Sequence, residues 1–325
     1  MTHRLLLTIF LLACITSPTT ALSMTIKLGV VTKPGSAQNI VAEKFKETVE
    51  RESEGSIVVK IFHSKSMGTE TEILQQIQLN TLQMGIITAG VFDTFDPLVR
   101  VINYPFLFKD HAQADEILDG PLGLKILRSL ESSGFKGLCF SENGFRNLTN
   151  NIRPVTSPDD IKGLKVRVMA SALHRAIWQA LGANPTPMPW PIYTELEQGV
   201  IDGQENPLWV MEVYKLYEVQ RYLSLTRHVY SPHIDVASLK WWQTLDEPTR
   251  DLLQRAMYSA AVYQRQDNRS KNDMRLAMLK EKGFVVEENP DFKSLRTAVA
   301  DLQDIELYQQ PQVKELLFEI LQATR

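Results

Sequence analysis

The stretch "GVIDGQENPLWV", residues 199–210, places six mostly polar residues, Asp202 to Pro207, between two hydrophobic stretches. This composition is typical of a tight turn, and also of a polar rim that faces a ligand. Asn206 is a preferred N-cap residue and Pro207 is favoured at the first position of a helix, so we expect a helix to begin there and to run through residues 208–219. A helix N-terminus also favours a bound anion, so the two interpretations are compatible.

The segments before this stretch predict a separate α/β lobe. "LKVRVM" (164–169) alternates strictly between apolar and mostly charged positions, which is typical of a strand and places the side chain of Arg167 opposite the apolar face. Residues 171–181 and 192–198 read as helices, and 185–191 as an extended Pro-rich segment. Residues 149–163 carry Pro, Asn, Asp and Gly, a composition typical of a connection between lobes. We therefore expect a second lobe over residues 149–231.

The first part of the chain alternates predicted strands with predicted helices. Strands are expected over 25–31, 56–62, 84–88 and 135–140, and helices over 36–54 and 70–82. In the first helix Val41, Phe45 and Val49 recur every fourth residue, while charged residues fill the other faces. Such alternation favours parallel α/β layers. We assign residues 24–148, with part of 232–325, to a first lobe.

A long stretch without helix breakers follows the second lobe. Residues 249–282 contain neither Gly nor Pro, with Pro248 before them and Gly283 after them. A single helix over 248–283 would extend about 50 Å, longer than one lobe, and could cross both. The alternative is two helices with a break near Asp267 and Asn268. Residues 284–325 are then expected to be a C-terminal segment that packs on the lobes.

The N-terminus has the pattern of a secretory signal. A short basic region precedes a nine-residue apolar run, Leu5 to Ala13, which is too short to span a bilayer. Small residues follow, so residues 1–23 are interpreted as a cleaved signal peptide. A lipoprotein site at Cys14 and a buried N-terminal helix are the alternatives. After cleavage Cys139 is the remaining cysteine, and its apolar neighbours favour a core residue without a disulfide over a nucleophile.

Composition and motifs exclude several classes of function. The formal net charge of −3 does not suit a nucleic-acid-binding surface. The catalytic and phosphate-binding motifs G-x-S-x-G, H-E-x-x-H and G-x-x-x-x-G-K-[ST] do not occur, nor does a paired C-x-x-C. The histidines occur singly, at spacings that do not present two nitrogens to one metal: His3, His63, His111, His174, His228 and His233. An exported two-lobed chain of this kind is expected to bind rather than catalyse, with no metal and no cofactor.

Two arginines are candidates for holding an acidic ligand. The planar guanidinium of Arg167 can bind a carboxylate through two parallel hydrogen bonds, although a solvated strand face would explain it as well. Arg146, in "ENGFRNLTN", lies just before the expected connection between lobes, where a cleft would form. A surface arginine is the alternative for Arg146.

Several motifs, taken together, resemble one protein family. "DGQENP" (202–207), "GFRNLTNNIRPV" (144–155), "IKGLKVRV" (161–168), "ALGANPTPMPW" (180–190), "NYPFLFKD" (103–110) and "YKLYEVQRYL" (214–223) are similar to motifs of the solute-binding proteins of TRAP (tripartite ATP-independent periplasmic) transporters. The motifs occur in the family's order and cover nearly all of the chain after the signal. The resemblance implies an α/β, two-lobed periplasmic binding protein fold with hinge strands and a long helix across both lobes.

The resemblance also implies a function and a site. The protein would capture a small organic acid between its lobes in the periplasm and deliver it to the small and large permease subunits of the membrane, driven by an ion gradient. In the family, the Arg of "KVRV", here Arg167, binds the ligand carboxylate. The Asn of "QENP", here Asn206, assists it, and the Arg of "GFR", here Arg146, adds a second contact. No nucleic acid or membrane insertion is implied, and a monomer is expected.

The family also suggests residues for the rest of the ligand. Sugar-acid binders often use an acidic residue in the helix after the second strand, for which Glu72 is the candidate, with an exposed helical charge as the alternative. Trp209, His233 and Asp235 are candidates for the far side of the pocket, and Trp190 is a candidate for packing. The pattern favours a uronate or aldonate. C4-dicarboxylates, 2-oxo acids, other hydroxy acids and small sulfonates stay open.

Two other classes of function are compatible with the same residues. A ligand-sensing subunit of a membrane receptor would use the same fold. An exported enzyme acting on an organic acid would need an acid–base pair in the cleft, and Glu72 with His233 is the pair available.

Overall fold

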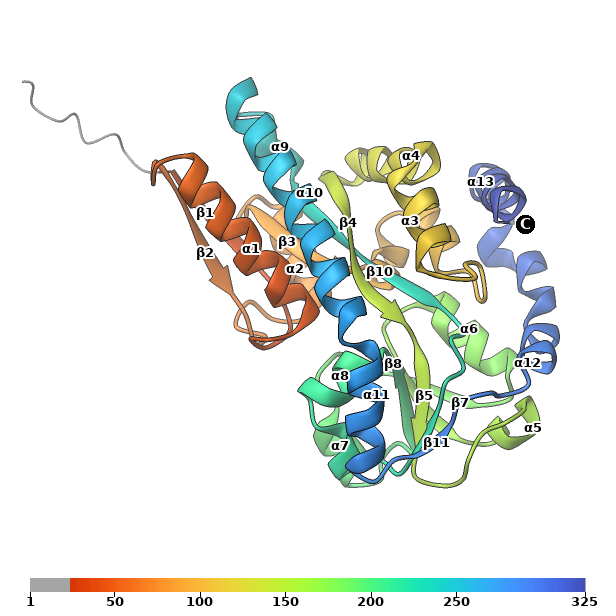
Figure 1. Cartoon of the computed structure of the whole chain (residues 1–325). Coiled ribbons are helices and arrows are strands. Elements are labelled where there is room, and N and C mark those ends of the chain that lie inside the picture. The colour runs from red at the N-terminus through yellow and green to blue at the C-terminus, as the bar shows by residue number, and fades with distance from the viewer. Residues whose placement is uncertain (1–23, 325) are drawn as a thin grey trace, which may run out of the picture.

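A computed structural model describes residues 24–324 of the chain, and the predicted signal peptide lies outside these residues. The chain forms two lobes, each built on its own β-sheet (Figure 1). It passes from the first sheet to the second at Arg146, because β4 (Phe135–Phe145) ends just before it and β5 (Asn147–Asn150) begins just after it. This crossing lies a few residues before the predicted connection at 149–163.

The first lobe has a five-stranded sheet of mixed direction, in the order β2-β1-β3-β10-β4. Strand β1 runs parallel to β2 and β3, whereas β10 runs antiparallel to β3 and β4. The other strands are β1 (Met24–Gly29), β2 (Ile57–Phe62), β3 (Met84–Thr88) and β10 (Tyr230–Ser238). The helical segments are α1 (Ala37–Glu52), α2 (Glu70–Gln78), η1 (Ala89–Thr94), η2 (Pro97–Asn103), α3 (His111–Asp119), α4 (Pro121–Ser129) and η3 (Leu130–Ser133), where η marks a 3₁₀ helix.

The amphipathic pattern of helix α1 explains why it packs on this sheet. Val41, Phe45 and Val49 are fully buried in one core cluster with residues of β1 and β2. Burying one such side chain stabilises the fold by about 1.5–3 kcal/mol. Ser36 begins the helix, because its side chain accepts a hydrogen bond from the backbone N–H of Asn39. The predicted helix at 36–54 is confirmed with slightly shorter bounds.

The second lobe has a six-stranded sheet in the order β11-β9-β5-β8-β6-β7. The strands not yet given are β6 (Lys165–Val168), β7 (Asn184–Pro187), β8 (Gly203–Asn206), β9 (Tyr222–Ser224) and β11 (Val285–Glu287). The helices are α5 (Pro158–Ile161), α6 (Ala172–Ala180), α7 (Tyr193–Glu197), α8 (Leu208–Val213) and η4 (Leu216–Glu218). Strand β8 lies between β5 and β6, so the polar motif "GQEN" is a buried central strand rather than a turn.

The predicted helix start at Asn206 is wrong by one residue. Pro207 occupies the N-cap position of α8 without a side-chain cap, and Asn206 is the last residue of β8. Helix α8 also ends at Val213 instead of residue 219, because Lys215 adopts a left-handed conformation with φ of 53°. Asn206 therefore does not cap a helix, and its side chain is available for another role.

The predicted single helix over 248–283 is divided in two. Helices α10 (Glu247–Ser270) and α11 (Asn272–Glu281) are separated by Lys271, close to the alternative break near Asp267 and Asn268 (Figure 1). Helix α10 packs against α1 and β4 of the first lobe, whereas α11 packs against α8 of the second. At the break, Arg275 donates to the carbonyl oxygen and to Oδ1 of Asn268 and also bonds Glu212, so one side chain holds both segments and the second lobe together.

The C-terminal segment contacts both lobes. Helix α13 packs against η2, and α12 packs against α5. The remaining helical segments are α9 (Leu239–Trp242), α12 (Phe292–Ala298), η5 (Ala300–Asp304), η6 (Glu306–Tyr308) and α13 (Pro311–Ala323). Within residues 24–324, no helix combines the length and the apolar character that a membrane crossing needs.

Candidate ligand-binding site

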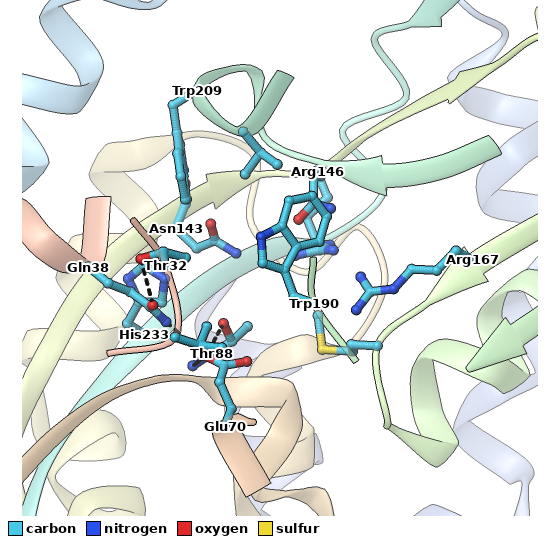
Figure 2. Close-up of a pocket in the computed structure, with 14 residues that line it drawn as sticks. Thr32, Gln38, Glu70, Thr88, Asn143, Arg146, Arg167, Trp190, Trp209 and His233 are labelled. Atoms are coloured by element: carbon cyan, nitrogen blue, oxygen red, sulfur yellow. Dashed lines mark hydrogen bonds between the residues drawn. The ribbon is translucent and has the colours of Figure 1, made fainter. Parts of the chain in front are cut away.

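A cavity of about 410 Å³ lies between the two lobes (Figure 2). The first lobe contributes Val31, Thr32, Gln38, Glu70, Thr88, Asn143 and His233. Arg146 lines the cavity from the point where the chain passes between the sheets, and the second lobe contributes Arg167, Met169, Trp190, Asn206, Trp209 and Val210. The three central strands β5, β8 and β6 therefore bring the region of Arg146, Asn206 and Arg167 to one wall.

Arg167 is a buried cation without an acidic partner. Its Nε and Nη2 donate to the carbonyl oxygen of Met188 at 2.9 and 2.5 Å, and its guanidinium lies 5.6 Å from the ring centre of Trp190. No carboxylate among residues 24–324 forms a salt bridge with it. Burial lowers the pKa of Arg167 to about 10, so the group remains charged at neutral pH. A buried charge without a partner is unfavourable, and a ligand carboxylate would relieve that cost.

Arg146 differs from Arg167 because a protein carboxylate already neutralises it. Its Nε and Nη2 bond the two carboxylate oxygens of Glu205, and Nη2 also donates to the backbone oxygen of Glu205 at 2.5 Å. Nε2 of His228 lies 3.0 Å from the same carboxylate, and Nδ1 of His174 lies 3.6 Å from it. Although burial opposes it, Arg146 and the two histidines hold the pKa of Glu205 well below its usual range. The Arg146 nitrogen that remains for a ligand is Nη1.

The acidic residue of the cavity is Glu70, not Glu72. Oε1 of Glu70 accepts hydrogen bonds from the backbone N–H and the hydroxyl of Thr88 at 2.8 and 2.9 Å, and from Nε2 of Gln38 at 2.8 Å. Oε2 of Glu70 has no hydrogen-bond partner among the described residues. Burial raises the pKa of Glu70, and these hydrogen bonds oppose that effect.

The assignment of Glu72 to the cavity is contradicted. Glu72 is exposed, and its carboxylate accepts from the backbone N–H and the hydroxyl of Thr69 in a capping box at the start of α2. The sequence carried the signal for this, since Thr69-x-x-Glu72 is the capping-box pattern. The enzyme hypothesis had relied on Glu72 acting together with His233, and the structure does not assemble this pair.

The remaining candidates divide between cavity and core. Asn206, Trp209 and His233 line the cavity, and Trp190 lines it as well as packing on Tyr214. Asp235 is in the core, where it accepts hydrogen bonds from Ser141 at 2.8 Å and Cys139 at 3.3 Å.

Asn206 and His233 each have a polar atom without a hydrogen-bond partner among the described residues. Nδ2 of Asn206 donates to Oε1 of Gln204 at 2.6 Å, which leaves its second amide hydrogen and its oxygen. Burial lowers the pKa of His233 to about 3, so its ring is neutral.

Sequence reasoning missed the first-lobe wall of the cavity and the partner of Arg146. The wall residues Thr32, Gln38 and Thr88 come from a loop, a helix and a strand end, and Thr32 donates to Gln38 at 2.9 Å. Glu205 lies inside the motif "GQENP", where a polar residue on a central strand could have indicated a buried partner.

Two α/β lobes that enclose a small cavity lined from both sides define a two-lobed solute-binding protein. Residues 28–310 match the family model "Bacterial extracellular solute-binding protein, family 7". The chain belongs to this family, the solute-binding proteins of TRAP transporters.

Relatives of known name cover nearly the whole chain. The 2,3-diketo-L-gulonate-binding periplasmic protein of Escherichia coli strain K12 is 33% identical, over 91% of this chain and 90% of its own. The TRAP periplasmic solute-binding protein of Polaromonas sp. JS666, solved with D-erythronate, is 33% identical with a TM-score of 0.88, over 92% of this chain and 98% of its own. The sugar-acid-binding protein of Advenella mimigardefordensis strain DPN7T, solved with galactonate, is 32% identical with a TM-score of 0.87. The match covers 93% of this chain and 98% of the Advenella chain.

Proposed function

We propose that this TRAP solute-binding protein captures a sugar monoacid, an aldonate or a uronate, and that Arg167 binds the ligand carboxylate. The observation that carries the proposal is the buried guanidinium of Arg167, which has no acidic partner among the described residues. Charge-assisted hydrogen bonds to a carboxylate would satisfy it. The sugar acids bound by relatives from Polaromonas and Advenella support the same class of ligand.

The charges in the cavity favour one acidic group over two. Arg146 is neutralised by Glu205, so Arg167 is the cation that remains for a ligand. The opposite wall presents Glu70, whose Oε2 can accept a hydrogen bond from a hydroxyl but offers no positive charge to a second carboxylate. This arrangement favours a hydroxylated monoacid over a C4-dicarboxylate. Small sulfonates and 2-oxo acids remain alternative ligands because they also present one anionic head to an arginine.

The expected mechanism is electrostatic capture followed by closure of the lobes. The anion meets Arg167, and Asn206 and Nη1 of Arg146 complete the contacts to its head group. Closure removes water, which strengthens these charge-assisted bonds. The ligand shifts the balance toward the closed form only as far as it binds that form more tightly.

Replacing Arg167 tests the proposal. Arg167→Ala is expected to weaken the binding of galactonate and galacturonate at least about 100-fold, because the ligand carboxylate would lose its buried partner. Isothermal titration calorimetry gives the affinity. Arg175→Ala is the matched control, since Arg175 is an exposed arginine of the same lobe and should leave the affinity unchanged. Wild-type affinity in the Arg167→Ala protein would contradict the site.

The partners and the compartment follow from family membership. We infer that the protein acts in the periplasm and delivers its ligand to the small and large permease subunits of a TRAP transporter. It binds without chemical change, so ligand recovered unaltered after incubation is the expected result. A neighbouring pair of genes for multi-span membrane proteins would support transport, whereas a neighbouring sensor kinase gene would favour the ligand-sensing alternative.

A further inference from the structure

Two buried polar atoms on the first-lobe wall of the cavity have no hydrogen-bond partner. They are Nδ1 of His233 and Oδ1 of Asn143, and both residues line the cavity. Buried polar atoms are hydrogen-bonded in the great majority of cases, so such an atom needs an explanation. Two such atoms on residues that line the same cavity indicate a ligand that supplies the missing bonds.

The two residues occupy fixed places on neighbouring strands. His233 is on β10 and Asn143 is on β4, and these strands pair antiparallel. The backbone oxygen of Asn143 accepts a hydrogen bond from Nε1 of Trp209 at 2.8 Å, and its Nδ2 lies 3.4 Å from the hydroxyl of Ser231. The Oδ1 atom is therefore held in place while it stays unbonded.

His233 and Asn143 lie away from Arg167, the cation proposed to bind the carboxylate. In Figure 2, His233 and Asn143 lie on one side of the cavity and Arg167 lies on the other. A ligand whose carboxylate contacts Arg167 would therefore place its far end near His233 and Asn143.

The chemistry of the wall selects hydroxyl groups. Because burial lowers the pKa of His233 to about 3, the neutral imidazole offers one donor and one acceptor. Oδ1 of Asn143 is an acceptor. A hydroxyl both donates and accepts, whereas a second carboxylate has no hydrogen to donate and would meet no cation on this wall.

We propose that His233 and Asn143 form a distal subsite that binds the hydroxyl groups of a sugar acid at the end away from its carboxylate. This inference rests on the proposed function and adds the length and the hydroxylation of the ligand. It assigns selectivity for six-carbon over four-carbon sugar acids to these two residues.

The test compares His233→Phe with His233→Gln. Phe fills similar space without a hydrogen bond, whereas Gln restores a donor and an acceptor. Calorimetry with galactonate and with the shorter D-erythronate gives the ratio of the two dissociation constants. We expect wild type to prefer galactonate, His233→Phe to reduce that preference at least about 10-fold, and His233→Gln to recover most of it. Asn143→Ala, with folding checked by thermal unfolding, should reduce the preference in the same direction.

Each other outcome contradicts a specific statement. Wild-type affinities for both ligands in both His233→Phe and Asn143→Ala would overturn the subsite and would mean that water satisfies these atoms. An equal loss for both ligands would also overturn it, because the residues would then act on the whole cavity. Wild-type preference for D-erythronate would overturn it as well. If wild type bound no sugar acid at all, the proposed function would fail, and the subsite with it.

Discussion

Asp235 shows how strongly the surroundings of a single residue decide its role. Its carboxylate is fully buried and bonded to a hydroxyl and a thiol, whereas His233, two residues earlier on the same strand, lines the cavity. Burial raises the pKa of Asp235 to about 7, with the hydrogen bonds and Arg265 opposing it. The same principle separates Arg167 from Arg146, since only Arg146 has a protein carboxylate as partner.

The raised pKa of Asp235 predicts a specific pH dependence of stability. An acid whose folded pKa exceeds its unfolded value of about 3.8 stabilises the protein at low pH, and this contribution is lost as the pH rises toward about 7. One pKa unit corresponds to about 1.4 kcal/mol, so the effect should be a few kcal/mol. Asp235→Asn should therefore be more stable than wild type at pH 8, as measured by chemical denaturation.

The control for this prediction is Asp251→Asn, which makes the same chemical change at an exposed position. It should leave the difference in unfolding free energy between pH 5 and pH 8 as in wild type. If Asp235→Asn had the pH dependence of wild type, Asp235 would not titrate in this range.

At the scale of elements, strand β8 shows why "DGQENP" has its particular sequence. The strand is central in the second sheet, and Gly203 pairs with Asn150 of β5. A Cβ at position 203 would lie 2.1 Å from the carbonyl oxygen of Thr149, so the strands can approach only because this residue is glycine. The following polar residues then use their side chains, Glu205 toward Arg146 and Asn206 toward the cavity.

Gly203→Ala should destabilise the protein by about 3 kcal/mol or more, because the contacted atoms are backbone and cannot move without breaking the β5–β8 pairing. Thermal or chemical unfolding measures the loss. Gly85→Ala is the matched control, since its added Cβ would meet the end of the Ile77 side chain at 2.8 Å, which can rotate. Equal losses in the two variants would show that the close strand approach is not the reason for the glycine.

At the scale of the whole molecule, Tyr214 and Lys33 join the two lobes beside the cavity residue Trp190. The hydroxyl of Tyr214, in the second lobe, accepts a hydrogen bond from the backbone N–H of Lys33, in the first, at 3.3 Å. The ammonium group of Lys33 also lies 4.9 Å from the centre of the Tyr214 ring, which packs edge-to-face on Trp190. These contacts connect a wall of the cavity to the opposite lobe and should be made when the lobes close.

Tyr214→Phe should speed ligand dissociation about 3- to 10-fold and leave association nearly unchanged. The substitution removes one hydrogen bond between the lobes, worth about 0.5–1.5 kcal/mol, and it keeps the ring contacts. Stopped-flow fluorescence measures both rates. Tyr217→Phe is the control, because the Tyr217 hydroxyl has no hydrogen bond among the described residues and should leave both rates unchanged. A dissociation rate equal to that of wild type would mean that this contact does not hold the lobes closed.

The sequence by itself determined the local elements and the family. Periodicity placed α1 and the strand of Arg167, because the side chains that an element buries repeat along its own length. The absence of Gly and Pro indicated the helical stretch 249–282. Periodicity also placed Arg167 on a strand face opposite the apolar one, and the motif order indicated the two-lobed fold.

The tertiary structure decided which side chains meet. Arg146 and Glu205 are 59 positions apart, and Asp235 and Cys139 are 96 apart. Periodicity predicts which face of an element is buried, but not which element covers that face. For this reason the structure has Glu70 rather than Glu72 in the cavity and Asp235 in the core. It also divides the predicted long helix at Lys271, with α10 packed on the first lobe and α11 on the second.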